Sequence, residues 1–83
     1  MKLAAHVKFR EEGFGGVLFE TRSEKVYTLT PTAAAVVQAV AAGSPDHEIA
    51  PALAQRFDAP KGTIEREVTA FLSDLRQKGL IED

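Results

Sequence analysis

The dipeptide Thr30-Pro31 divides the sequence into two parts with different hydrophobic periodicities. A threonine side chain accepts a backbone N–H bond at the start of a helix, and a proline that follows it has a φ angle already near the helical value. Before this dipeptide, apolar residues alternate with polar ones, which is typical of strands. After it, they recur every three or four residues, which is typical of helices. The chain is therefore expected to form a sheet first and helices afterwards.

Three short strands are predicted within residues 6–29. In the first, Val7 and Phe9 alternate with polar neighbours, as a half-buried strand requires. A glycine-rich stretch separates it from a second strand over residues 17–21. The third, Lys25–Leu29, is rich in β-branched and aromatic residues. Short connections between consecutive strands favour an antiparallel meander.

Three helices are predicted after the strands, within residues 31–42, 45–57 and 60–78. Pro51 lies inside the second range, and proline removes a backbone hydrogen bond from a helix interior. A kink, or a helix that effectively starts later than Pro45 suggests, is therefore expected there. The third helix has the strongest periodicity, and its apolar face comprises Ile64, Val68, Phe71, Leu72 and Leu75. A three-stranded antiparallel sheet followed by three helices makes an α+β domain.

Length and composition indicate one soluble domain over residues 1–83. The chain has 83 residues, of which 45% are hydrophobic and 27% charged, which suits a single hydrophobic core. It has no cysteine, and its first residues lack the apolar segment of a signal peptide. A cytoplasmic location is therefore expected. The formal net charge is −2 with both signs interspersed, so no strong attraction to membranes or nucleic acid is predicted.

No catalytic, metal or cofactor site is predicted from the motifs. His6 and His47 do not share a metal-ligand spacing, and the serines lack a nucleophile-elbow motif. The glycines at 13, 15 and 16 lack phosphate-loop spacing and are interpreted as a strand connection. Phe14 between them is expected to close over the edge of the core, with contact to a partner as the alternative. The chain is therefore predicted not to be an enzyme.

Two segments resemble the PqqD-like family, the peptide-recognition elements of pathways that modify ribosomally made peptides. Residues 26–33 read V-Y-T-L-T-P-T-A and are similar to the family's V-Y-x-L-N-x-T-A. Residues 67–81 read E-V-T-A-F-L-S-D-L-R-Q-K-G-L-I and are similar to D-V-x-x-F-L-x-x-L-x-x-x-G-L-L. Thr30 and Glu67 depart from the usual asparagine and aspartate. The resemblance extends from Val7 to Ile81, and residues 9–16 also resemble the R-x-E-x-F-G run of mycofactocin-type, radical-SAM-associated members.

The resemblance implies a small winged-helix domain that binds the leader segment of a precursor peptide without catalysis. The leader would add a strand to the open edge of the third strand, against a wall formed by the third helix. The implied peptide-binding residues are Lys25, Val26, Tyr27, Thr28, Leu29, Glu67, Ala70, Phe71, Asp74 and Lys78. Phe71 and Leu75 are interpreted either as walls of this cleft or as core residues.

The implied partners are the precursor peptide and a modifying enzyme such as a radical-SAM enzyme, a protease or a cyclase. No cofactor, nucleic acid or membrane partner is expected, and the chain is expected to be a monomer or an edge-strand dimer. The alternatives are a generic protein-interaction domain and a DNA-binding winged-helix regulator. The mixed charges of residues 61–78 argue against DNA, because a DNA-reading helix normally carries a basic stripe.

Overall fold

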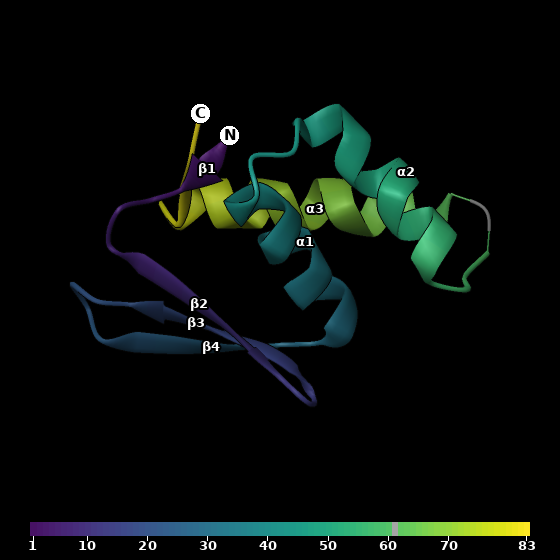
Figure 1. Cartoon of the computed structure of the whole chain (residues 1–83). Helices are drawn as coiled ribbons and strands as arrows, with labels where there is room; N and C mark the ends of the chain where they lie inside the picture. The colour runs from purple at the N-terminus through teal and green to yellow at the C-terminus, as the bar shows by residue number, and fades with distance from the viewer. Residues whose placement is uncertain (61) are drawn as a thin grey trace.

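A computed structural model describes residues 1–60 and 62–83 of the chain. A three-stranded antiparallel sheet, in the order β2-β3-β4, packs against three helices (Figure 1). Its strands are β2 (Val7–Glu12), β3 (Gly15–Glu20) and β4 (Lys25–Leu29). The helices are α1 (Pro31–Ala41), α2 (Asp46–Arg56) and α3 (Thr63–Gln77). The predicted α+β order of a sheet followed by three helices is confirmed.

Two short strands at the chain ends are absent from the sequence-based prediction. β1 (Lys2–Leu3) pairs antiparallel with β5 (Ile81–Glu82), and the N- and C-termini lie close together in Figure 1. Two residues are too few to show the alternation that identifies a strand in a sequence. The pairing places Ile81 in the core, where 5% of its surface is exposed.

The helices lie within their predicted ranges, but two of their starts differ. α2 begins at Asp46 and continues through Pro51, so the late start predicted from this proline is wrong. Burial of Ile49 and Leu53 against the core holds the helix together despite the missing bond. α3 begins at Thr63, after Gly62 in the left-handed conformation, and Lys61 of the predicted range lies outside the described residues. No helix in the described part is long and apolar enough to cross a bilayer.

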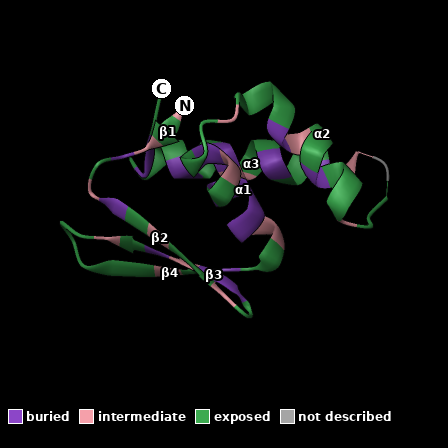
Figure 2. Cartoon of the chain, in the orientation of Figure 1, coloured by how far each residue is buried: buried purple, intermediate pink, exposed green. Residues whose placement is uncertain are grey.

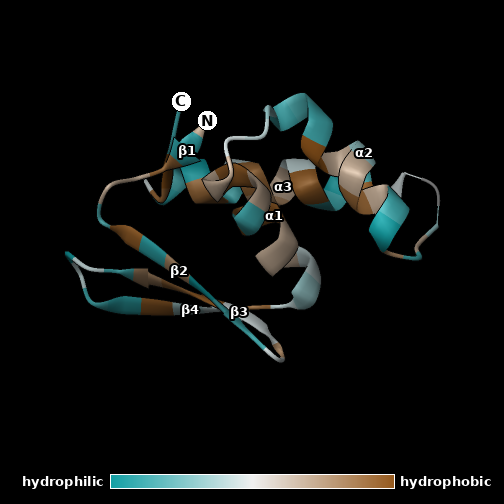
Figure 3. Cartoon of the chain, viewed as in Figure 1, coloured by the Kyte–Doolittle hydropathy of each residue, from teal (hydrophilic) through white to brown (hydrophobic). Residues whose placement is uncertain are grey.

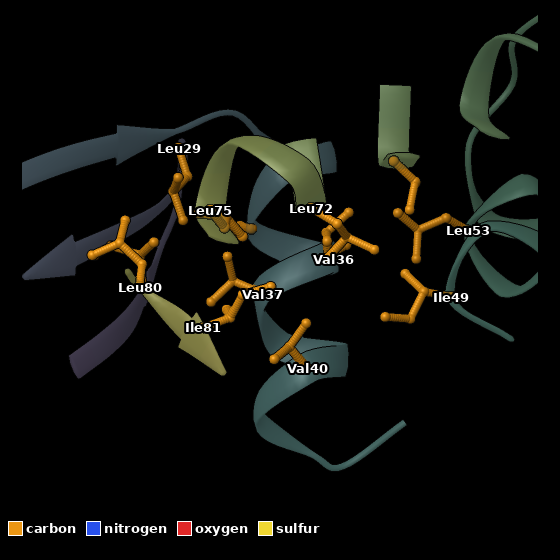
Figure 4. Close-up of a cluster of buried hydrophobic side chains, with 14 of the residues drawn as sticks. Leu29, Val36, Val37, Val40, Ile49, Leu53, Leu72, Leu75, Leu80 and Ile81 are labelled. Carbon is orange, nitrogen blue, oxygen red and sulfur yellow. The ribbon is translucent and has the colours of Figure 1, made fainter. Parts of the chain in front are cut away.

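Helix α1 forms the centre of the hydrophobic core. It lies between the sheet and the other two helices, and its buried segments appear purple in Figure 2. Val36 and Val40 are each 1% exposed and Val37 is fully buried. Figure 4 shows Val36 near Leu72 of α3, with side chains of α2 beyond them. An apolar helix of this kind is stable only when neighbours cover several of its faces.

The two faces of the sheet have different neighbours. The register pairs Phe9, Leu18 and Tyr27 across the three strands, and all three contribute to or pack on the core. Because side chains alternate along a strand, the next row, Lys8, Phe19 and Val26, points away from the helices. Figure 3 shows the corresponding alternation of apolar and hydrophilic segments along β2 and β4.

The glycine-rich stretch forms the connection between β2 and β3, as expected. Gly13 and Phe14 are the two residues between the strands. Phe14 is 55% exposed, so the expectation that it closes over the core is wrong. The tight turn holds its side chain beyond the end of the sheet. Gly15, the first residue of β3, has a φ of 143° and lies against the backbone where β4 joins α1.

The turn between β3 and β4 lowers the pKa of a carboxyl group. The Ser23 hydroxyl and the Arg22 backbone N–H both donate to the Glu20 carboxylate, and His6 Nε2 lies 3.7 Å from it. The Ser23 hydroxyl has the largest effect, and together these contacts outweigh partial desolvation and hold the pKa of Glu20 below its ordinary value.

This carboxyl group makes the effect of Ser23→Ala depend on pH. A folded-state pKa below the unfolded value gives stability above the unfolded pKa, about 4.3 for glutamate, that is lost as pH falls through the folded pKa. The loss of unfolding free energy in Ser23→Ala should therefore be larger at pH 7 than at pH 3. Urea unfolding at both pH values measures it, with Ser73→Ala on the exposed side of α3 as the control. An equal loss at both pH values would contradict this role of Glu20.

Candidate functional site

Strand β4 has an open backbone edge, because its only strand partner among the described residues is β3. In an antiparallel pair, alternate residue pairs are hydrogen-bonded, and the residues between them direct their N–H and C=O groups away. The Thr21 N–H donates to the His6 carbonyl at 2.8 Å, so by alternation Phe19 of β3 also bonds to β2.

The same alternation identifies the backbone N–H and C=O groups of β4 that do not bond to β3. Val26 is the cross-strand partner of Phe19, and Phe19 uses its backbone groups toward β2. The N–H and C=O groups of Val26, and of Thr28 two residues on, therefore point to the open edge. Lys25, Tyr27 and Leu29 direct theirs to β3.

A groove lies between β4 and α3 and continues toward the start of α1. Its first part, about 200 Å³ in volume, is lined by Leu18, Tyr27, Thr28, Leu29, Phe71, Asp74, Leu75, Lys78 and Leu80. Its second part, about 160 Å³, is lined by Thr30, Thr32, Ala33, Val36, Glu67, Val68 and Phe71. Half-buried Phe71 borders both parts, so they lie on either side of this residue, and we refer to them together as the β4–α3 groove.

The floor of this groove is the hydrophobic core itself. Leu29, Leu75 and Leu80 lie close together in Figure 4, and each is at most 5% exposed. Leu75 is therefore a core residue that also forms part of the floor. Phe71 is partly buried on the groove wall, so of the two residues only Phe71 has a face open to a ligand.

Seven of the ten predicted site residues line the groove, and three do not. Lys25 and Ala70 are exposed but border neither part of it, and the Val26 side chain points to the opposite face of the sheet. The contribution of α1 was missed by sequence reasoning. Thr32, Ala33 and Val36 look like ordinary helix residues in the sequence, and only the packing of α1 beside α3 brings them to the groove.

The charges of the groove wall are partly neutralised. Lys78 Nζ lies 2.5 Å from Asp74 Oδ1, one helical turn away, and both side chains are about half exposed. Glu67 forms no ion pair with the described residues and lies toward the α1 end. Lys25, at the opposite end of β4, likewise has no ion pair within the described part of the chain. The site therefore has an acidic end and a basic end.

The groove combines an apolar floor with polar groups at its rim, as a peptide-binding surface does. Within residues 1–60 and 62–83, no group of three or more His, Cys, Asp or Glu residues is placed to hold a metal ion. The polar groups of the groove are Thr30, Thr32, the charged side chains of the rim and the unpaired backbone groups of β4. An extended chain can satisfy such an edge and place alternate side chains into an apolar groove.

The fold and site define a small α+β domain of the winged-helix type with a preformed groove beside an open sheet edge. The family model described as coenzyme PQQ synthesis protein D (PqqD) matches residues 15–81. This match covers most of the chain, which therefore belongs to the PqqD family. None of the curated proteins matches it.

Two solved structures share this fold over nearly their whole length. A lasso peptide synthetase B1 complexed with the leader peptide has a TM-score of 0.82 and 24% identity, over 99% of this chain and 96% of that one. TbiB1 in complex with the TbiA(beta) leader peptide has a TM-score of 0.86 and 23% identity, over 99% and 95%. The predicted fold and family are thus confirmed.

Proposed function

We propose that this chain binds the leader segment of a ribosomally made precursor peptide, without catalysis, and presents it to a modifying enzyme. The observation that carries the proposal is the open edge of β4 directly beside the apolar β4–α3 groove. Membership of the PqqD family supports it. So does the similarity in fold to two proteins solved as complexes with leader peptides.

The leader would bind as an added strand. Its backbone would pair with the N–H and C=O groups of Val26 and Thr28, which gives affinity with little dependence on sequence. Every second side chain would then face α3. Apolar side chains at these positions would enter the groove on either side of Phe71 and cover the Leu75 floor.

Selectivity would come from the groove wall. An antiparallel leader, the arrangement already used throughout this sheet, would begin near Glu67 and end near Lys25. A basic residue near its start and an acidic residue near its end would match these two charges. The ion pair of Asp74 and Lys78 lies between them and would contact the leader's middle.

A radical-SAM enzyme, a protease and a cyclase are all compatible with a domain that holds only the leader. A cytoplasmic location and a monomeric or edge-dimeric state remain predictions. The mixed charge of α3, with Arg76 paired to both Asp46 and Asp83, gives no support to DNA binding.

An amide-shift titration tests this placement of the site. The genes that flank this chain's own are first read for a short precursor and its modifying enzyme. The probe is a synthetic peptide covering the N-terminal half of that precursor, and a peptide with the same residues in scrambled order is the control. Perturbations are expected along β4, along α3 from Glu67 to Lys78 and at the start of α1. Shifts confined to α2 and β2, or equal shifts with the scrambled peptide, would contradict the proposal.

A further inference from the structure

The outer face of the sheet carries an apolar patch that the β4–α3 groove does not use. Phe19 is 36% exposed and Val26 61% exposed, and the two are cross-strand partners. With half-buried Val17 they form what we term the outer-face patch. It borders a shallow hollow of about 470 Å³. The solvent face of an antiparallel sheet is normally polar, so adjoining large apolar side chains there indicate an interaction surface.

Basic residues border this patch along β2. Lys8 is the cross-strand partner of Phe19, and Arg10 is that of Val17, so the basic row lies beside the apolar row. Arg10 is paired with Glu12 at 2.5 Å, whereas Lys8 forms no ion pair within the described part of the chain. A complementary surface is therefore apolar with carboxylates on the side that faces β2. A second copy of this chain would bring a basic row of its own instead of unpaired carboxylates, so it complements this surface less well than an acidic one does.

The patch is continuous with the proposed leader site, because β4 belongs to both. The side chains of Val26 and Thr28 lie on the outer face, while their backbone groups form the open edge. A leader strand added to that edge would widen the outer face by one strand. Its side chains that do not face α3 would lie next to Val26 and Thr28. The bound leader and the outer-face patch would then form one surface.

We propose that the outer-face patch docks the modifying enzyme, through an apolar surface of that enzyme flanked by carboxylates, and that the bound leader completes the contact. The enzyme then binds the leader-loaded domain more tightly than the empty one. This inference rests on the proposed leader binding. In this arrangement the β4–α3 groove selects the leader, and the outer-face patch binds the enzyme.

Matched variants distinguish the role of the outer-face patch from that of the β4–α3 groove. Phe19→Ser removes the aromatic ring from the patch, and Phe14→Ser makes the same change at an exposed ring at the hairpin tip. Lys8→Glu reverses the rim charge, and Lys8→Arg keeps it. Val17→Thr, a change of similar shape within the patch but on β3 instead of the edge strand, serves if Phe19→Ser unfolds by circular dichroism.

The assay measures two affinities for each full-length variant. A fluorescein-labelled leader peptide reports leader binding by anisotropy, and calorimetry with the enzyme encoded beside the precursor reports docking to the loaded domain. Phe19→Ser and Lys8→Glu are expected to weaken docking by about tenfold or more, as central interface residues do. Leader affinity should stay within about twofold, and Phe14→Ser and Lys8→Arg should dock like the unchanged chain.

Three results would overturn this inference. Docking that is unchanged in Phe19→Ser, Val17→Thr and Lys8→Glu would show that the enzyme binds elsewhere. Leader affinity that falls together with docking would assign the patch to the leader site. A dimer of the unchanged chain that Phe19→Ser dissociates in sedimentation equilibrium would identify a second copy as the occupant. If the unchanged chain binds no leader, the proposed function itself fails, and that outcome is visible in the anisotropy arm alone.

Discussion

Replacing Thr28 by proline is expected to weaken leader binding about 5- to 150-fold while the domain stays folded. The range corresponds to the roughly 1–3 kcal/mol lost when one partner of a buried hydrogen bond has no donor. The alternation of the β3–β4 pair directs the Thr28 N–H to the open edge, so proline there removes no bond to β3. Edge strands are also where sheets tolerate proline best.

Two companion variants make this result specific. Thr28→Val keeps the backbone N–H and removes only the hydroxyl, so it should bind the labelled leader like the unchanged chain. Tyr27→Pro removes an N–H that bonds to β3, so it should disrupt β4 and lower the free energy of unfolding. Anisotropy gives the affinities and circular dichroism the folding. Equal affinities for Thr28→Pro and the unchanged chain would exclude strand addition at this edge.

Gly15→Ala is expected to destabilise the domain by about 2–6 kcal/mol. A Cβ at this position would lie 2.2 Å from the Leu29 carbonyl oxygen, 2.7 Å from the Thr30 carbonyl carbon and 2.9 Å from the Pro31 nitrogen. These are backbone atoms, which cannot rotate away. The strained φ of 143° costs about 1–3 kcal/mol for a residue with a Cβ, and overpacking costs about as much again.

The same hairpin supplies the control for this change. A Cβ at Gly13 would meet no atom within 4 Å, and its φ is not positive, so Gly13→Ala should alter stability by no more than about 1 kcal/mol. A domain of 83 residues has a total stability of about 4–12 kcal/mol. The expected loss in Gly15→Ala is a sizeable share of this total, and urea titrations extrapolated to water measure it as a lower free energy of unfolding. Similar losses in both variants would contradict the role of the backbone contact.

The sequence predicted the elements that have a clear period and missed the features that depend on packing. The apolar face of α3 and the Thr30 cap of α1 were predictable, because helical spacing and capping residues act locally. α2 begins after Pro45 without a side-chain cap. The outer-face patch was not. Val17, Leu18 and Phe19 form a continuous apolar run, and such a run does not reveal which residue faces the core. Only the register with β2 and β4 places Leu18 inside and Phe19 outside.

The sequence identified the strand and the helix that border the candidate site, but it did not identify all of the residues that line it. The resemblance to the PqqD family identified β4 and α3, and both border the groove. Periodicity alone left open whether Phe71 and Leu75 are exposed. α3 is rotated so that Leu75 faces the core while Phe71 lies on the wall, and this rotation depends on how α3 packs against the rest of the domain. Ala70, one residue away, faces solvent for the same reason.

The pairing of β1 with β5 makes this open chain nearly a closed ring. The first and last strands are held side by side, with Leu3 opposite Ile81, so a few added residues would suffice to join the two ends covalently. New ends can then be opened at Gly43 and Ser44, in the exposed connection between α1 and α2, away from β4. Such a permuted domain would keep the groove and the outer face while offering its ends at a different place, from which other proteins can be attached.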